Sequence, residues 1–210
     1  IEANGFVPED LSKGPNGEDF REDAKDFTTY DANAAQEALN QALQELGKSE
    51  LTLRLLYGTD ESPMDTMATY LQNAFTKLDG LNIEMVATTK QDRIYNKEAN
   101  GDFDLACTRW GPDYGDPTTY LYLMKTGNQN NYGKWSNEQY DALLNQVNTE
   151  LDVQKRWDLM LQAEELAMND YANIPVFQKG NTALLNPKVK DLVNQQVGTP
   201  FTFKYVYKEG

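Results

Sequence analysis

Residues 51–88, LTLRLLYGTDESPMDTMATYLQNAFTKLDGLNIEMVAT, predict a strand, a helix and a second strand in succession. Residues 51–55 alternate between leucine and polar side chains, the period-two pattern of a strand with one buried face. Ser62-Pro63 offers a hydroxyl N-cap and a proline at the first helical position, and apolar residues at helical spacing follow up to Asp79-Gly80. Residues 83–87 alternate again, so the stretch predicts a β-α-β unit.

The alternation of helices and strands continues beyond this unit. Residues 90–100 predict a short helix closed by Asn100-Gly101, and residues 103–108 predict a third strand. A β-α-β-α-β order predicts an α/β fold with a mostly parallel or mixed sheet, flanked by helices and joined by right-handed crossovers.

The flanking segments have different characters. Residues 1–30 are rich in glycine, proline and charged residues and predict loops or an extended arm, after which Asp31 and Gly47 fit the N-cap and the C-terminal glycine of a helix. Further helices are expected at 118–125, from a capping box at Ser136-Asn137-Glu138-Gln139 through Val147, and after an Asp152 N-cap, and further strands at 174–177, 182–185 and 201–207.

Composition and charge exclude several functions. The 210 residues are 40% hydrophobic, which supports a folded core, and the net charge of -14 argues against nucleic acid as a partner. The chain has no histidine, which removes histidine-dependent catalysis and imidazole metal sites, and its single cysteine, Cys107, is expected to be a buried, inert thiol. No apolar run is long enough to span a membrane, and no cofactor or metal site is expected.

The loop after the third expected strand is the strongest candidate for a ligand site. The sequence GDFDLACTRWGPDYGDP at 101–117 ends its apolar alternation at Arg109-Trp110 and opens into glycine, proline, aromatic and acidic residues. A flat indole and a carboxylate suit a ligand with a cationic group. Each feature also has a structural interpretation: Trp110 as a core residue, Asp113 as an Asx turn, and Asp116 as a cap of the next helix.

The segment GDFDLACTRWGPDYGDPTTYL at 101–121 resembles the solute-binding proteins of peptide ABC importers, solute-binding protein family 5. The segments LTLRLLY, LNIEMVATT, WSNEQYDALLNQ and LQAEELAMNDYANIPVFQKG keep the order found in that family, so the resemblance covers roughly residues 30–207. It implies the type II periplasmic-binding-protein-like fold, with the chain as a C-terminal fragment of a longer protein. Residues 31–174 would then be the second lobe, 1–30 an arm, and 175–210 a return segment toward the first lobe.

The resemblance also implies a function and a site. Asp113 would pair with the free α-amino group of an oligopeptide, and the backbone of Arg109, Trp110 and Gly111 would pair with peptide amides. Trp110 would form a wall of a side-chain pocket, and Tyr114 is a further candidate. The expected partners are an oligopeptide and the permease subunits of an ABC transporter, and the expected location is extracytoplasmic, either periplasmic or as a lipid-anchored protein at the cell surface.

Three alternatives remain at this point. A pheromone or signal receptor could use the same fold for one peptide. A carboxylate-based hydrolase could use Asp113 and Asp116, although two carboxylates at this spacing are common and no nucleophile accompanies them. Binding of a non-peptide such as a nickel complex or a sugar is also compatible with the fold, but an aspartate at position 113 favours a ligand that carries an amine.

Overall fold

The computed structural model describes residues 1–180, 182–195 and 197–210. It divides into two compact units, of which one is Thr29–Arg109 and the other joins Ile1–Thr28 to Trp110–Gly210. The lobe expected at 31–174 therefore includes parts of both units. That expectation concerns the lobes of a longer protein, and its boundaries stay a prediction.

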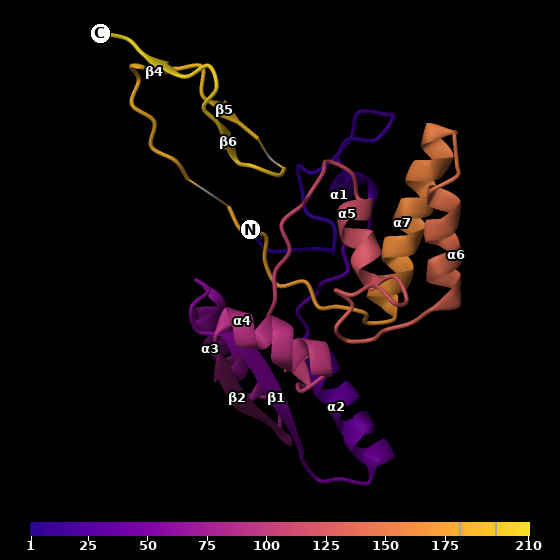
Figure 1. Cartoon of the computed structure of the whole chain (residues 1–210). Helices are drawn as coiled ribbons and strands as arrows, with labels where there is room; N and C mark the ends of the chain where they lie inside the picture. Colours follow the sequence, from indigo (N-terminus) through magenta and orange to yellow (C-terminus); the bar gives the residue numbers. More distant parts are fainter. Residues whose placement is uncertain (181, 196) are drawn as a thin grey trace. The chain divides into compact units, whose positions relative to one another are not determined.

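The unit Thr29–Arg109 is built on a parallel sheet (Figure 1). Its strand order is β2-β1-β3, with Leu51 of β1 opposite Leu81 of β2, and Leu55 of β1 opposite Leu105 of β3. The elements are α2 (Ala32–Leu46), β1 (Leu51–Gly58), α3 (Met64–Phe75), β2 (Leu81–Thr88), α4 (Lys90–Asp92), the π-helix η1 (Arg93–Glu98) and β3 (Leu105–Ala106). This confirms the β-α-β-α-β order expected from the sequence.

One face of this sheet forms the core of the unit. Leu55 of β1 and Ile83 of β2 are buried together with Met64 and Ala68 of α3, and Leu39 of α2 packs against them. The period-two pattern of the strands places these side chains on one face, and the helical spacing of α3 matches it. The third strand is shorter than the expected 103–108, because only two of its residues pair with β1 in the sheet.

The helix caps expected from the sequence are confirmed at some positions and wrong at others. Asp31 caps α2 as expected, and Gly47 ends it in the left-handed conformation with φ 64°. At α3, however, Pro63 occupies the N-cap position and no side chain caps the helix, so the expected hydroxyl cap at Ser62 is wrong. At α6 the cap is Asn137 rather than Ser136, and its side chain accepts hydrogen bonds from the first turn.

The other unit is mostly helical. Its elements are α1 (Phe20–Asp23), α5 (Thr118–Leu121), the 3-10 helix η2 (Tyr122–Met124), α6 (Glu138–Val147), α7 (Val153–Asn169), β4 (Val189–Lys190), β5 (Val193–Asn194), β6 (Phe201–Thr202) and β7 (Tyr207–Lys208). The helices α6 and α7 run side by side (Figure 1). Tyr140, Leu144 and Trp157 from these two helices are buried in one core, and Asp152 caps α7 as expected.

The segment 1–28 has little regular structure, but it is part of this core. Val7 and Phe20 are completely buried, and the Phe20 ring meets Trp157 edge-on at 5.1 Å between centroids. Arg21 pairs with the fully buried Glu164 of α7, and the same carboxylate accepts a hydrogen bond from the backbone N–H of Val7 at 2.7 Å. The segment therefore consists mostly of loops and packs into the core of its unit.

The C-terminal segment contains less strand than the sequence predicts. Residues 174–177 form only an isolated bridge between Phe177 and Glu2, and residues 182–185 form no strand. The expected strand at 201–207 is two short strands, β6 and β7, each paired with a different partner. Apolar alternation marks these positions, but their side chains are largely exposed and no wide sheet is built among the described residues.

Candidate functional site

The loop that follows β3 is fixed by the helix α5 that comes after it. The hydroxyl of the buried Tyr120 donates a hydrogen bond to the carbonyl of Trp110 at 3.3 Å. The hydroxyl of Thr119 accepts a hydrogen bond from the backbone N–H of Asp113 at 3.1 Å. Burial raises the pKa of Tyr120 to about 12, so its phenol stays a neutral donor. These two bonds hold the backbone on both sides of Gly111.

The side chains of this loop face solvent. Trp110 is 37% exposed and Tyr114 is 44% exposed, and the Asp113 side chain is exposed as well. Within the described part of its own unit, the Asp113 carboxylate has no hydrogen-bond or ion-pair partner, because its loop contact uses the backbone N–H. The loop therefore presents a free anionic group together with two aromatic surfaces.

Asp116 is engaged by the protein itself. Its two oxygens accept hydrogen bonds from Arg156 of α7 at 2.8 and 3.2 Å, and one of them also accepts the backbone N–H of Thr118 at 3.0 Å. Burial alone would raise the pKa of Asp116, but the bonds from Arg156 and Thr118 outweigh it and the pKa is lowered. Asp116 is thus bonded within the protein, but it is not the expected cap of the next helix, because Pro117 is the N-cap of α5 and no side chain caps that helix.

Arg109 and Gly111 complete the set of candidate residues. Arg109 is the last residue of the other unit, and its guanidinium donates to the carbonyl of Ser62 at 3.3 Å. Gly111 is exposed, and a Cβ atom added there would meet no other atom within 4 Å. The structure thus places Trp110, Gly111, Asp113 and Tyr114 in one loop of one unit, and it gives no local steric reason for glycine at 111.

A buried charge cluster beneath the end of β3 was missed by the sequence analysis. Arg93 of η1 donates to Glu61 at 2.7 Å, to Glu98 and to the hydroxyl of Thr108 at 3.0 Å, and the side chains of Arg93, Glu61 and Glu98 are all at most 2% exposed. Desolvation raises the pKa of Glu98, against the opposing effect of Arg93. Only tertiary structure brings Glu61 to Arg93, so spacing along the chain gave no signal for this cluster.

Cys107 lies beside this cluster and is buried, as expected. Desolvation raises the pKa of its thiol to about 11, with a weak opposing effect of Arg93. A thiol with this pKa carries almost no thiolate at neutral pH, which agrees with an inert packing role.

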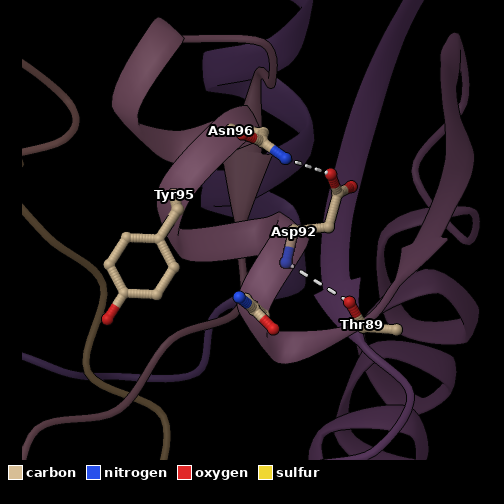
Figure 2. Close-up of a pocket in the computed structure, with 5 residues that line it drawn as sticks. Thr89, Asp92, Tyr95 and Asn96 are labelled. Carbon is tan, nitrogen blue, oxygen red and sulfur yellow. Dashed lines mark hydrogen bonds between the residues drawn. The ribbon is translucent and has the colours of Figure 1, made fainter.

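A hollow of about 310 Å³ on the π-helical segment is shown in Figure 2. Asp92 is already bonded there: its backbone N–H donates to Thr89 at 3.3 Å, and its carboxylate accepts from Asn96 at 2.7 Å. The Tyr95 ring extends away from these groups into solvent (Figure 2). Thr89, Asp92 and Asn96 are thus bonded to one another. No candidate residue of residues 110–117, which we call the Trp110 loop, lines this hollow.

Two further observations concern the described residues as a whole. No helix in residues 1–180, 182–195 or 197–210 is long and apolar enough to cross a membrane. In the same residues, no group of three or more Cys, Asp or Glu side chains is arranged to hold a metal ion.

Comparison with known sequences shows relatives over almost the whole chain. Residues 1–132 match the family of bacterial extracellular solute-binding proteins, family 5 Middle. The dipeptide-binding protein of Lactococcus lactis is 34% identical over 98% of this chain and 38% of its own length. The dipeptide-binding protein DppE of Bacillus subtilis is 29% identical over 93% of this chain and 36% of its own length, so the chain spans well under half of these relatives.

Comparison with solved structures identifies the fold. The oligopeptide ABC transporter substrate-binding domain of Bacillus anthracis matches all of this chain and 41% of its own, with a TM-score of 0.87 at 27% identity. Listeria monocytogenes OppA bound to peptide matches all of this chain and 40% of its own, with a TM-score of 0.85 at 32% identity. The fold is the α/β, type II periplasmic-binding-protein-like fold, and the chain belongs to family 5 of the bacterial extracellular solute-binding proteins.

Proposed function

We propose that this chain is part of the extracytoplasmic solute-binding component of an ABC importer, which binds oligopeptides and delivers them to the membrane permease. The observation that carries the proposal is the free carboxylate of Asp113, presented on a loop whose backbone is fixed by Thr119 and Tyr120. An exposed carboxylate on a fixed backbone, beside two aromatic side chains, suits a ligand that combines a cationic end with a peptide-like body.

The names of the similar proteins, which describe peptide binding, support this proposal. The Lactococcus lactis relative is a dipeptide-binding protein, and the Listeria monocytogenes structure contains a bound peptide. Because the chain spans about 40% of that structure's chain, the activity concerns a longer protein in which a further lobe would enclose the ligand.

We assign separate roles to the candidate residues. Asp113 binds the α-amino group of the peptide, where removal of one partner of an enclosed ion pair would cost roughly 3–5 kcal/mol. The backbone of Arg109, Trp110 and Gly111 pairs with peptide amides and so contributes affinity without selecting side chains. Trp110 and Tyr114 contribute the walls of a side-chain pocket.

The proposal also covers the partners, the location and the absence of catalysis. The permease subunits of an ABC transporter would receive the ligand, and the protein would act outside the cytoplasm, either in the periplasm or lipid-anchored at the cell surface. We assign no catalytic residue, since Asp116 is engaged with Arg156 and Cys107 is buried with a raised pKa. Release of amino acids from a peptide incubated with the purified protein would contradict this assignment.

The amine-anchor role is tested by calorimetry with the full-length protein and two peptides that differ only in N-terminal acetylation. Acetylation removes the charge that Asp113 would bind, so we expect affinity to fall at least a hundredfold. Replacement of Trp110 by alanine should weaken the binding of both peptides by a similar factor, because the indole would contact the body of the ligand. Equal affinity for the free and acetylated peptides would contradict the proposed function.

A second candidate function is reception of one signalling peptide. A solved structure described as the pheromone receptor PrgZ matches all of this chain, with a TM-score of 0.84 at 26% identity. A panel of peptides that share length but differ in sequence separates the two functions. Similar affinities across the panel indicate uptake of many peptides, whereas strong preference for one sequence indicates a receptor.

A further inference from the structure

A second hollow, of about 320 Å³, lies in the N-terminal segment and is separate from the Trp110 loop. Its walls come from residues within Ile1–Thr28 and so belong to one compact unit. Five of the side chains that line it are acidic: Glu9, Asp10, Asp19, Glu22 and Asp26. A concentration of like charge around one cavity raises the local concentration of cations.

Asp19 is the most informative of these residues because it is only 9% exposed. It is the N-cap of α1, and its Oδ1 atom accepts the backbone N–H of Arg21 at 2.9 Å. Its Oδ2 atom is buried and has no hydrogen-bond partner among the described residues. A buried carboxylate oxygen without a donor is unfavourable, and this one belongs to a residue that lines the hollow.

The one cation that lines the hollow does not neutralise it. Both terminal nitrogens of Arg21 are bonded to the buried Glu164, which balances the charge of Arg21, while its Nε atom is buried without a hydrogen-bond partner among the described residues. Glu22 accepts the backbone N–H of Asp19 at 2.9 Å. The carboxylates of Glu9, Asp10 and Asp26 form no hydrogen bond or ion pair with the described part of their unit, and they are exposed to solvent at the rim.

The arrangement favours an organic cation over a metal ion. A metal requires oxygens that converge within about 2–2.6 Å of one point, and no three acidic side chains among the described residues are arranged in that way. Here the carboxylates are distributed around a hollow of about 320 Å³. A guanidinium or alkylammonium group carries several N–H donors on a larger frame and can reach separated acceptors, including a buried one.

We propose that this acidic hollow binds a guanidinium or alkylammonium group, with Asp19 Oδ2 as its buried acceptor and Glu9 and Asp26 as acceptors at the rim. The group would come from a small organic cation or from an arginine or lysine side chain of another protein, since both present the same donors. The site is independent of the peptide site proposed above, because it shares no residue with the Trp110 loop.

The proposal is tested by NMR titration of the 210-residue chain with agmatine at low ionic strength. We expect saturable shifts of the backbone amides of Asp19 and Arg21, and about tenfold weaker binding in the variant Asp19→Asn. Asparagine is also a good N-cap, so α1 is retained while the charge is lost. Asp26→Asn, at an exposed position, gives a second variant that does not depend on the helix cap and should weaken binding in the same direction.

The control variant is Glu37→Gln, which removes one exposed charge on α2, in the other compact unit. It should leave agmatine binding unchanged, and tetramethylammonium, which has no N–H donor, should not compete. Tighter binding of N-acetyl-arginine amide than of agmatine would indicate a protein side chain as the natural source, and the reverse a small cation. Absence of saturable binding by both ligands, or equal weakening by Glu37→Gln and Asp19→Asn, would overturn the proposal.

Discussion

The two aspartates of the Trp110 loop differ in the partners of their carboxylates. Asp116 is held by Arg156 and Thr118 and has a lowered pKa, whereas the Asp113 carboxylate is exposed and unpaired within the described part of its unit. Their spacing of three residues gives no indication of this difference. Carboxylates that a protein has already paired stabilise its structure, and those it leaves free are available to a ligand.

The largest effect expected on the paired side is at Glu164. Replacing it with glutamine leaves the buried guanidinium of Arg21 without its counter-charge, and we expect the free energy of unfolding to fall by about 3–5 kcal/mol. The neighbouring Glu165, which pairs with the exposed Lys25, provides the matched control. Its change to glutamine should cost at most about 1 kcal/mol, and equal losses in urea denaturation would show that the buried pair has no special role.

A smaller effect is expected at Asp116, whose pair with Arg156 is about one-third exposed. Asp116→Asn should lower the free energy of unfolding by about 1–2 kcal/mol, because one charge-assisted pair becomes neutral in a partly solvated place. Asp113→Asn should change stability by no more than about 0.5 kcal/mol. Urea denaturation of the two variants tests the comparison directly, and a larger loss at Asp113 would reverse it.

The pH dependence of stability provides a further test with opposite signs. The raised pKa of Glu98 means that its contribution to stability is fully present below its unfolded pKa, near 4.5, and is lost as pH rises through the folded pKa. Asp116 has a lowered pKa, so its contribution is present above about 3.8 and is lost as pH falls.

These signs are checked with denaturation midpoints of Glu98→Gln and Asp116→Asn between pH 2 and pH 8. The loss of stability caused by Glu98→Gln should be smallest at high pH, where the unchanged protein carries the buried charge. The loss of stability caused by Asp116→Asn should be smallest at low pH. A pH-independent difference for Glu98→Gln would mean that the pKa of Glu98 is the same in the folded and unfolded states, and would contradict the expectation.

Local signals in the sequence were sufficient for much of the fold. The β-α-β-α-β order and the caps at Asp31 and Asp152 depend on residues close together in the chain, and the structure confirms them. The Ser62 cap was wrong because Pro63 itself takes the N-cap position. The strand expected at 182–185 was wrong because apolar alternation leads to a strand only where a partner edge pairs with it.

The site was predictable only in part. The sequence drew attention to the Trp110 loop, but the engagement of Asp116 by Arg156 depends on a contact across 40 residues of chain. Arg21 and Glu164 are 143 residues apart in the chain. The acidic hollow is formed by the folding of segment 1–28, for which the sequence predicted only loops or an extended arm. Residue spacing does not encode such contacts, so the pairing of charges has to be read from the structure.

The central claim is that Asp113 binds the amino terminus of a peptide, and a thermodynamic cycle tests it most directly. Calorimetry would measure the full-length protein and Asp113→Asn, each with a free and an N-acetylated peptide, and Asp158→Asn as a control at another exposed carboxylate. We predict that Asp113→Asn weakens the free peptide at least a hundredfold and barely affects the acetylated one. Equal weakening of both peptides by Asp113→Asn, or none, would contradict the claim.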